Sequence, residues 1–233
     1  MRQAPRQKSA ATAASADRRV VRTRRALRDA LAEEIEVTGD LSQVTVTAVS
    51  DRAGITRRTF YSHYRDIPDL VSSLEERTID ELRSHVARLS AVNLDELQRV
   101  IARLEPAPGA VGLLEYFRSR PYLSPLLGEG GDPAFAERIK LMVREVVQDR
   151  ALDGLDLRAI PFFDYYLTFV ISAEVGVLAR WLSAGMREDV GDMARVMTAL
   201  LFVRPGDLYG KSLQFDVDAL GLSLLGIKET SDD

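Results

Sequence analysis

Apolar positions recur at helical spacing along most of this chain. Within residues 18–37, Val20, Leu27, Leu31 and Ile35 fall near one face of a helix, and arginines cover much of the rest. No stretch alternates convincingly between polar and apolar residues, as a half-buried strand would. The pattern therefore predicts an all-α fold.

Glycine and proline clusters separate the later apolar runs. A long helix is expected to begin after Asp66, with Pro68 in its first turn, and to continue to about Leu89. The remaining helices are expected over 93–104, 110–119, 122–127, 133–151, 161–183, 189–202 and 218–225.

Residues 45–64 predict two short helices, 46–53 and 57–63, joined by a tight turn. Thr45 and Thr56 are suited to cap them, and Gly54 can adopt the left-handed conformation that ends the first helix. Such caps and turns occur in many helical hairpins. Here they are followed by basic and hydroxyl residues on the second helix, which favours a helix-turn-helix that enters the major groove of DNA.

Within this hairpin, Phe60 and Tyr64 lie four residues apart and would anchor the second helix to the protein. Arg57 and Arg58 would then face outward at its start, where an arginine can bond a guanine edge or a phosphate. A short basic helix is often only a solvated face. The candidate DNA-binding residues are Thr45, Thr56, Arg57, Arg58, Thr59, Tyr61, His63 and Arg65.

The charge distribution supports a basic N-terminal part. Residues 1–65 hold 13 Arg and Lys against 7 Asp and Glu, and residues 66–233 hold 18 against 28. The N-terminal segment thus carries a net charge of +6 and the rest of the chain −10, which sum to −4. The basic N-terminal segment is therefore suited to contact phosphate.

Composition weighs against an enzyme or a metalloprotein. The chain has no cysteine and only two histidines, without neighbours at metal-ligand spacing, so no metal or cofactor is expected. No Gly-rich phosphate loop follows a strand. No apolar run approaches the length of a membrane span, and no apolar segment follows the Arg-rich start, so neither a span nor a secretory signal is expected. The lack of cysteine fits a reducing cytoplasm, so a cytoplasmic protein is expected.

The hairpin also resembles the DNA-binding domain of the tetracycline-repressor (TetR) family. The matching residues are Thr45-Val46, Ala53-Gly54-Ile55, Thr59-Phe60-Tyr61, His63-Tyr64 and Asp69-Leu70-Val71. The resemblance implies an N-terminal helix-turn-helix head and a helical ligand-binding and dimerisation domain. It also implies that Thr45, Tyr61 and His63 lie near the DNA backbone. Many relatives have a lysine where this chain has Ile67, so no phosphate contact is expected from that position, and Arg65 is the candidate to replace it.

These observations divide the chain into four expected parts: a disordered basic arm over 1–16, a DNA-binding head over 17–66, an effector-binding and dimerisation domain over 67–203, and a C-terminal extension over 204–233. The arm would lie along phosphates or enter a minor groove, or would be a solvated tail without a specific role.

Residues 161–202 predict a helix that is apolar around most of its circumference, followed by a second amphipathic helix. The segment Arg-Trp-Leu-Ser-Ala-Gly-Met (180–186) resembles the last helices of one TetR subgroup and favours a homodimer surface; the alternative is the protein's own core. The expected interface residues are Ala173, Gly176, Val177, Arg180, Trp181, Val190, Met193 and Met197.

The family resemblance further implies a cavity for a small-molecule effector. Aromatic residues suited to line it are Tyr116, Phe117, Tyr122, Phe135, Phe162, Tyr165, Tyr166 and Phe169, each of which is equally suited to a core. The acidic rear is compatible with a cationic effector, although surface carboxylates explain it as well.

The expected function is a homodimeric transcription regulator that binds a palindromic operator in double-stranded DNA. By resemblance it is a repressor released by a small molecule. The alternative is a helical dimer without DNA binding that acts as a ligand carrier or a protein-interaction module.

Overall fold

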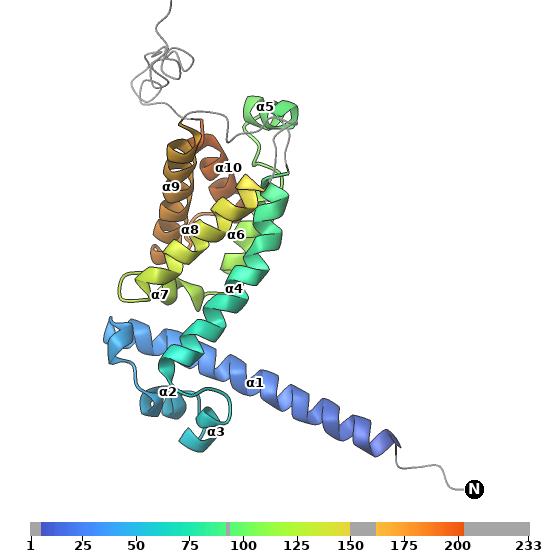
Figure 1. Cartoon of the computed structure of the whole chain (residues 1–233), viewed down its shortest axis with the longest axis vertical. Helices are drawn as coiled ribbons and strands as arrows, with labels where there is room; N and C mark the ends of the chain where they lie inside the picture. Colours follow the sequence, from blue (N-terminus) through green and yellow to red (C-terminus); the bar gives the residue numbers. More distant parts are fainter. Residues whose placement is uncertain (1–5, 92–93, 150–161, 203–233) are drawn as a thin grey trace, which may run out of the picture. The chain divides into compact units, whose positions relative to one another are not determined.

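The computed structural model describes residues 6–91, 94–149 and 162–202, and the regular elements in these ranges are all helices (Figure 1). In chain order they are α1 (Arg6–Thr38), the 3-10 turn η1 (Leu41–Gln43), α2 (Val46–Arg52), α3 (Arg57–Tyr61), α4 (Ile67–Leu89), α5 (Leu94–Ala102), α6 (Ala110–Arg118), α7 (Leu123–Leu127), α8 (Pro133–Gln148), α9 (Phe163–Ser183) and α10 (Val190–Leu200). The predicted all-α fold is confirmed for this part of the chain.

The expected N-terminal arm is wrong over residues 6–16, which form the first turns of α1. This segment is rich in alanine, the residue with the highest helix propensity, so a helix that begins further along can extend backward through it. Residues 1–5, the expected helix over 218–225 and the extension over 204–233 lie outside the described residues.

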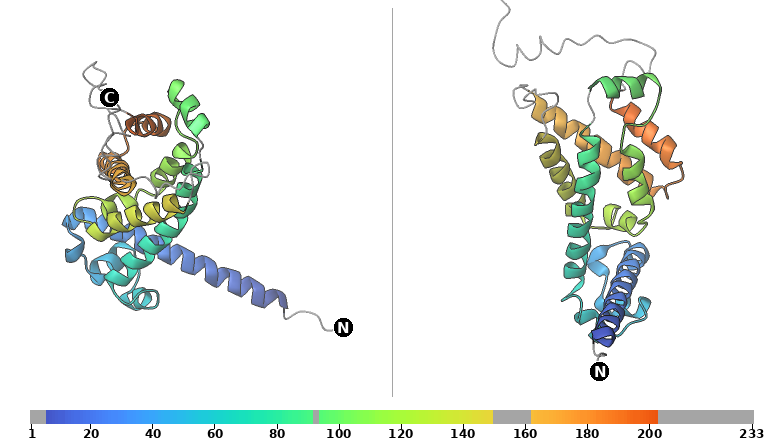
Figure 2. Two further views of the ribbon diagram at one scale, coloured as in Figure 1. Left: turned by 45° about the horizontal axis from the view of Figure 1, so that its top comes forward. Right: turned by 90° about the vertical axis from the view of Figure 1, so that its right-hand side faces the viewer.

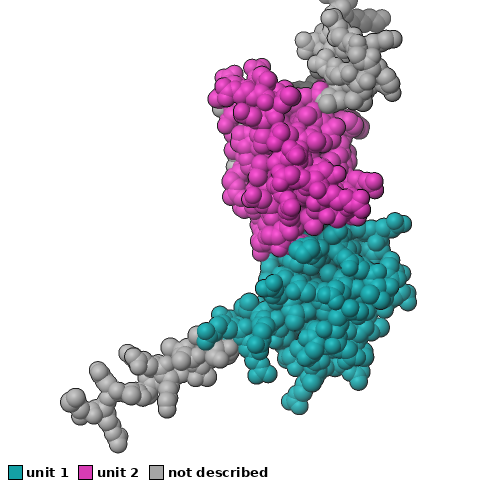
Figure 3. All heavy atoms as spheres, turned by 180° about the vertical axis from the view of Figure 1, so that it is seen from behind, with its two compact units in different colours: residues 1–78, 121–135 teal, residues 79–120, 136–233 magenta. Residues whose placement is uncertain are grey.

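The chain forms two compact units, which Figure 3 distinguishes by colour. Unit 1 comprises residues 1–78 and 121–135, and unit 2 comprises residues 79–120 and 136–233. Helix α4 contributes to both units. The expected domain boundary at residue 66 therefore needs correction, because unit 1 also includes the first half of α4 and the distant segment that contains α7.

Unit 1 is built around α1, which contacts α2, η1 and α7, while α2 contacts α3 (Figure 2). Its apolar side chains meet in one core, as the periodicity of α1 predicted. The most deeply buried members are Leu27, Leu31, Ile35, Val49, Phe60, Leu70, Leu123, Leu126 and Phe135.

Residues 121–135 contact the N-terminal helices of unit 1 on both sides of α7. The backbone N–H of Leu41 donates to the carbonyl oxygen of Gly130 at 2.7 Å, and the Arg28 guanidinium lies 3.9 Å from the centre of the Tyr122 ring. Gly130 has φ +87°, and a Cβ atom there would lie 2.1 Å from the carbonyl oxygen of Gly39. Only glycine permits this close approach of two backbones.

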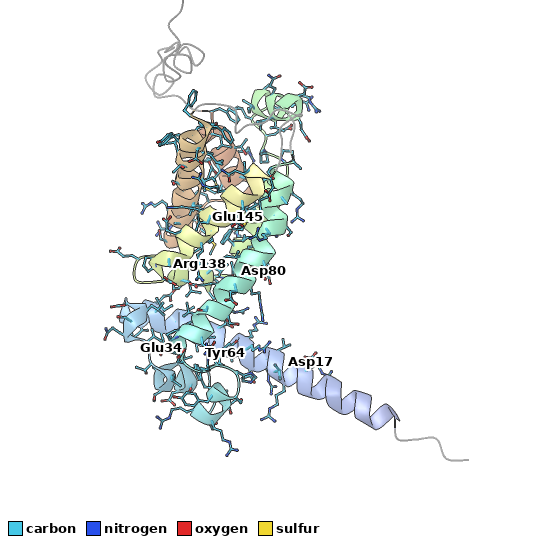
Figure 4. All side chains as sticks on the ribbon, viewed as in Figure 1. Asp17, Glu34, Tyr64, Asp80, Arg138 and Glu145 are labelled. Carbon is cyan, nitrogen blue, oxygen red and sulfur yellow. The ribbon has the colours of Figure 1, made fainter. Side chains whose placement is uncertain are left out.

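Unit 2 contains α5, α6, α9 and α10, most of α8 and the second half of α4, with α6 packed against α10. Two ion pairs join its other helices: Arg144 of α8 pairs with Asp164 of α9, and Arg83 of α4 pairs with Glu145 of α8 at 2.8 Å. Glu145 is labelled on α8 in Figure 4.

Helix α9 departs from expectation in one respect. It is long and apolar enough to cross a membrane by length and composition, whereas no run of that kind was expected. One such helix is weak evidence for a membrane span, because a core helix passes the same test. Only 28% of its most apolar 18-residue window is buried within the chain. Much of the helix therefore presents apolar surface that its own subunit leaves uncovered.

Candidate nucleic-acid interface

The helix-turn-helix has the local structure that its sequence predicted. The Thr45 side chain accepts a hydrogen bond from the N–H of Ala48 at 3.1 Å, and the Thr56 side chain accepts one from the N–H of Thr59 at 3.2 Å. Each threonine thereby satisfies a backbone donor at a helix start. Gly54 has φ +65°, the left-handed conformation expected in the turn.

Helix α3 is anchored from one side only. Phe60 is fully buried and Tyr64 is buried beside it, with 6.1 Å between their ring centres; Tyr64 is labelled in Figure 4. Arg57 and Arg58 at the start of the helix are exposed, and neither has an ion-pair partner among the described residues. Two unpaired guanidinium groups therefore project from the start of this helix.

A third arginine nearby has a structural role instead. Arg52 at the end of α2 bonds Glu34 at 2.5 Å and Glu33 at 3.0 Å, both on α1. These hydrogen bonds raise the pKa of the Arg52 guanidinium. The pairing joins α2 to α1 and occupies Arg52, so the free positive charge of the hairpin comes from α3.

A groove of about 280 Å³ lies between α1 and the α3 region. Arg19 and Thr23 line it from α1, and Arg58, Ser62 and His63 line it from the other side. The guanidinium of Arg19 and several hydroxyl donors in this concave site are suited to a phosphate oxygen. The sequence interpretation missed Arg19 and Thr23. Their spacing of four residues on α1 was a usable signal, but only the packing of α3 beside them gives it meaning.

The two ring residues near the end of α3 differ in exposure. Tyr61 is exposed, whereas His63 is partly buried. Burial, with a smaller contribution from the charge of Arg24, lowers the pKa of His63 below its ordinary value of 6.5. At neutral pH the imidazole is therefore mostly uncharged and is suited to donate a hydrogen bond rather than to contribute positive charge.

The start of α4 explains the unusual residue at position 67. Ile67 is buried in unit 1, so this position contributes to the core instead of presenting a cation. Arg65 is highly exposed and pairs with Asp69 at 3.3 Å. A hydrogen bond from the Arg65 backbone N–H lowers the pKa of the Asp69 carboxyl. Arg65 can reach a phosphate only by giving up this weak surface pair.

The expected aromatic pocket is not formed as a single site. Tyr116 and Phe117 are buried on α6 in unit 2, Phe162 is partly buried in the same unit, and Tyr122 and Phe135 belong to unit 1. The prediction is wrong for three residues of α9, because their side chains are exposed to solvent: Tyr165 (81%), Phe169 (70%) and Tyr166 (51%). Sequence spacing placed them on a helix but not on its outer face.

The expected dimer residues also divide between two environments. Ala173, Gly176 and Arg180 are exposed and Val177 is partly exposed. Four others are buried within the subunit and belong to its own core, which corrects the prediction: Trp181, Val190, Met193 and Met197. Val196 and Leu200 of α10 are exposed as well, so α9 and α10 each present apolar surface that the described residues leave uncovered.

Comparison with known proteins relates the C-terminal region to a family of regulators. Residues 105–202 match a TetR family model described as "Transcriptional regulator C-terminal region". This match covers α6 to α10, and it accompanies an N-terminal helix-turn-helix with the caps, turn and anchors described above. The C-terminal region of this chain thus resembles that of TetR-family transcriptional regulators.

Similar proteins include transcriptional regulators. This chain is 33% identical over 91 residues to the uncharacterized HTH-type transcriptional regulator YxbF of Bacillus subtilis; the match covers 38% of the chain and 24% of that relative's length. The chain thus spans about a quarter of this curated relative. Two solved structures are also similar. A TetR transcriptional regulator of Streptococcus agalactiae is 24% identical, with 81% of this chain and 98% of that chain covered and a TM-score of 0.49. The fatty acid degradation regulator FadR of Bacillus halodurans is 13% identical, with 77% and 94% covered and a TM-score of 0.48.

Proposed function

We propose that this chain is a TetR-family regulator that binds a specific site in double-stranded DNA through α3. The observation that carries the proposal is the exposure of Arg57 and Arg58, without partners among the described residues, at the start of a helix that the buried Phe60 anchors. Side chains at the start of such a helix enter the major groove first, where an arginine can bond guanine through two donors.

The remaining candidates surround α3 and are suited to the DNA backbone. Thr45 at the start of α2 and Tyr61 of α3 are exposed, and His63 lies in the groove that Arg19 also lines. Hydroxyl, imidazole and guanidinium donors to phosphate position a protein on the duplex without selecting its sequence. We assign these residues, with Thr59 and Arg65, to positioning, and we assign base recognition to Arg57 and Arg58.

We further propose that two copies associate through the uncovered apolar surface of α9 and α10. Tyr165, Phe169, Ala173 and Gly176 follow one another at helical spacing on the exposed side of α9. Small residues in this row allow α9 of a second subunit to approach closely. If this face of one subunit packs against the same face of the other, the two subunits form a two-fold symmetric dimer. A dimer of this kind binds a palindromic operator.

Regulation would act through the distance between the two heads. Paired recognition helices enter successive major grooves when they are about 34–36 Å apart. A small molecule bound in unit 2 that favours another separation would release the operator, and α4, which contributes to both units, is the element suited to transmit the change. We therefore favour a cytoplasmic repressor released by an effector.

The experiment is selection of duplexes from a random pool by the purified full-length chain, followed by binding assays on the selected sequence. A palindromic consensus is expected. Arg58→Ala should weaken the selected site by about 1–3 kcal/mol more than it weakens random duplex, because it removes base recognition. If no duplex is enriched and none binds at low salt, the DNA-binding assignment is wrong, and a dimeric carrier or interaction module becomes the better description.

A further inference from the structure

Helix α1 begins well before the core to which it contributes. Its first buried residue among those described is Leu27, and none of residues 17–26 is buried. Because the helix starts at Arg6, residues 6–26 lie before Leu27, and at 1.5 Å per residue they correspond to about 30 Å of helix. Figure 1 shows this segment projecting past α2 and α3. Packing against other elements stabilises most helices in proteins, so the position of this segment indicates a partner outside the subunit.

Positive charge is concentrated in residues 6–26 and is not balanced there. This segment holds seven Arg and Lys residues against one acidic residue, Asp17. No acidic residue lies in the first turn of α1, where the positive end of the helix dipole favours one. Arg18 and Arg22 are four residues apart and Arg22 and Arg25 are three apart, at spacings where like charges repel on a helix. A polyanion bound along the segment would relieve both effects.

One row of positions on this segment leads into the groove beside α3. Arg19 and Thr23 line that groove from α1. Arg22, three residues after Arg19, is exposed and has no ion-pair partner among the described residues. Toward the start of the helix the same row continues at intervals of three or four residues, and its positions hold Ser15, Thr12 and Lys8. Every position of this α1 row thus has a cation or a hydroxyl, the groups that commonly bind phosphate oxygens.

We propose that the α1 row is a second DNA-contacting surface, which follows the phosphate backbone of the duplex beyond the base pairs that α3 reads. The row is continuous with the groove beside α3, which favours the same duplex over any other polyanion. From position 23 back to position 8 the row spans about 22 Å of helix, and each DNA strand has one phosphate per about 3.4 Å of duplex axis, so the row can reach about six further base pairs. Such contacts add affinity and lengthen the site without selecting a sequence. This role depends on the proposed DNA binding through α3.

The test uses two duplexes that carry the operator selected as described above, extended on each side by about 2 or about 12 base pairs of unselected sequence. The slope of log Kobs against the logarithm of the salt concentration is measured for the full-length chain by fluorescence anisotropy. For the wild type this slope should be steeper on the long duplex by at least about 0.9 for each bound subunit, because at least one further phosphate is neutralised. Lys8→Gln should remove about 0.9 per bound subunit of this difference and leave the slope on the short duplex unchanged.

Arg6→Gln is the matched control. It removes the same charge two residues earlier, but two residues correspond to about 200° around the helix, so position 6 lies on the other side of α1 and the variant should keep the difference between the duplexes. Ala13→Pro interrupts the helix between Lys8 and Arg19 without changing the charge, so it should remove the part of the difference that depends on Lys8. Circular dichroism and thermal unfolding check that the core of each variant remains folded.

Three results would overturn the assignment. The first is an equal slope of the wild type on both duplexes, and the second is an equal loss in Arg6→Gln. The third is a full difference in Ala13→Pro, which would assign the contact to a flexible arm instead of a helix. A chain that binds its operator with equal slopes on both duplexes contradicts only the α1 surface, whereas a chain that binds no duplex contradicts the DNA-binding function as well.

Discussion

The groove between α1 and α3 makes a quantitative prediction about DNA binding. If Arg19 contacts a backbone phosphate, Arg19→Gln removes one neutralised phosphate per subunit. The slope of log Kobs against the logarithm of the salt concentration should then become shallower by about 0.9 per bound subunit, because the counterions condensed at that phosphate are no longer released on binding. Over a fourfold rise in salt, each lost contact changes the ratio of affinities by about 3.5-fold.

The assay is fluorescence anisotropy with a labelled duplex of random sequence between 50 and 200 mM salt, since a phosphate contact does not require the operator. Arg25→Gln is the matched control. The Arg25→Gln variant loses the same charge from the same helix. Arg25 lies six residues after Arg19, so it faces a different direction, and it pairs weakly with Asp29 at 3.7 Å.

Two results would refute this reasoning. A slope for Arg19→Gln equal to that of the wild type would mean that the groove holds no phosphate. An equal change in Arg25→Gln would mean that the effect reflects the overall charge of the head rather than a contact in the groove.

Other substitutions test the packing, the assembly and the partly buried carboxylate of Glu174 on α9. Gly130→Ala should lower the free energy of unfolding by about 2–4 kcal/mol, because the residue has positive φ and its Cβ would clash with the Gly39 carbonyl. Gly112→Ala is the control, since no atom lies within 4 Å of its added Cβ, and it should be neutral or stabilising. Urea denaturation measures both. Phe169→Asp should convert the dimer to a monomer in light scattering while the helical circular dichroism is retained; a variant that remains dimeric would exclude this face as the interface. Glu174 has a folded-state pKa raised from 4.5 to about 7, so the folded state binds the proton more tightly and this residue's contribution makes stability fall as pH rises from about 4.5 through 7. Glu174→Gln should remove that part of the pH dependence in urea titrations from pH 5 to 8, and an unchanged profile would contradict the assigned burial.

Much of the fold follows from local sequence signals. The helix expected after Asp66 and up to about Leu89 coincides with α4 (Ile67–Leu89), and Thr45 and Thr56 cap α2 and α3 as expected. Helical periodicity, capping hydroxyls and a turn glycine act within a few residues, so the chain encodes them without reference to distant segments. The same signals gave the exposed position of Arg57 and Arg58 at the start of α3 and the burial of Phe60 further along it.

The tertiary structure alone decided which segments share a unit and which face of α9 is covered. Periodicity could not reveal that residues 121–135 pack with the head, or that Arg19 lies beside Arg58 across a groove, since both depend on contacts between segments distant in sequence. Helix α9 is apolar around most of its surface, so its sequence favoured no single side. Packing within the subunit buries Trp181 and leaves Phe169 exposed, and it partly buries Glu174, whose charge has no described partner.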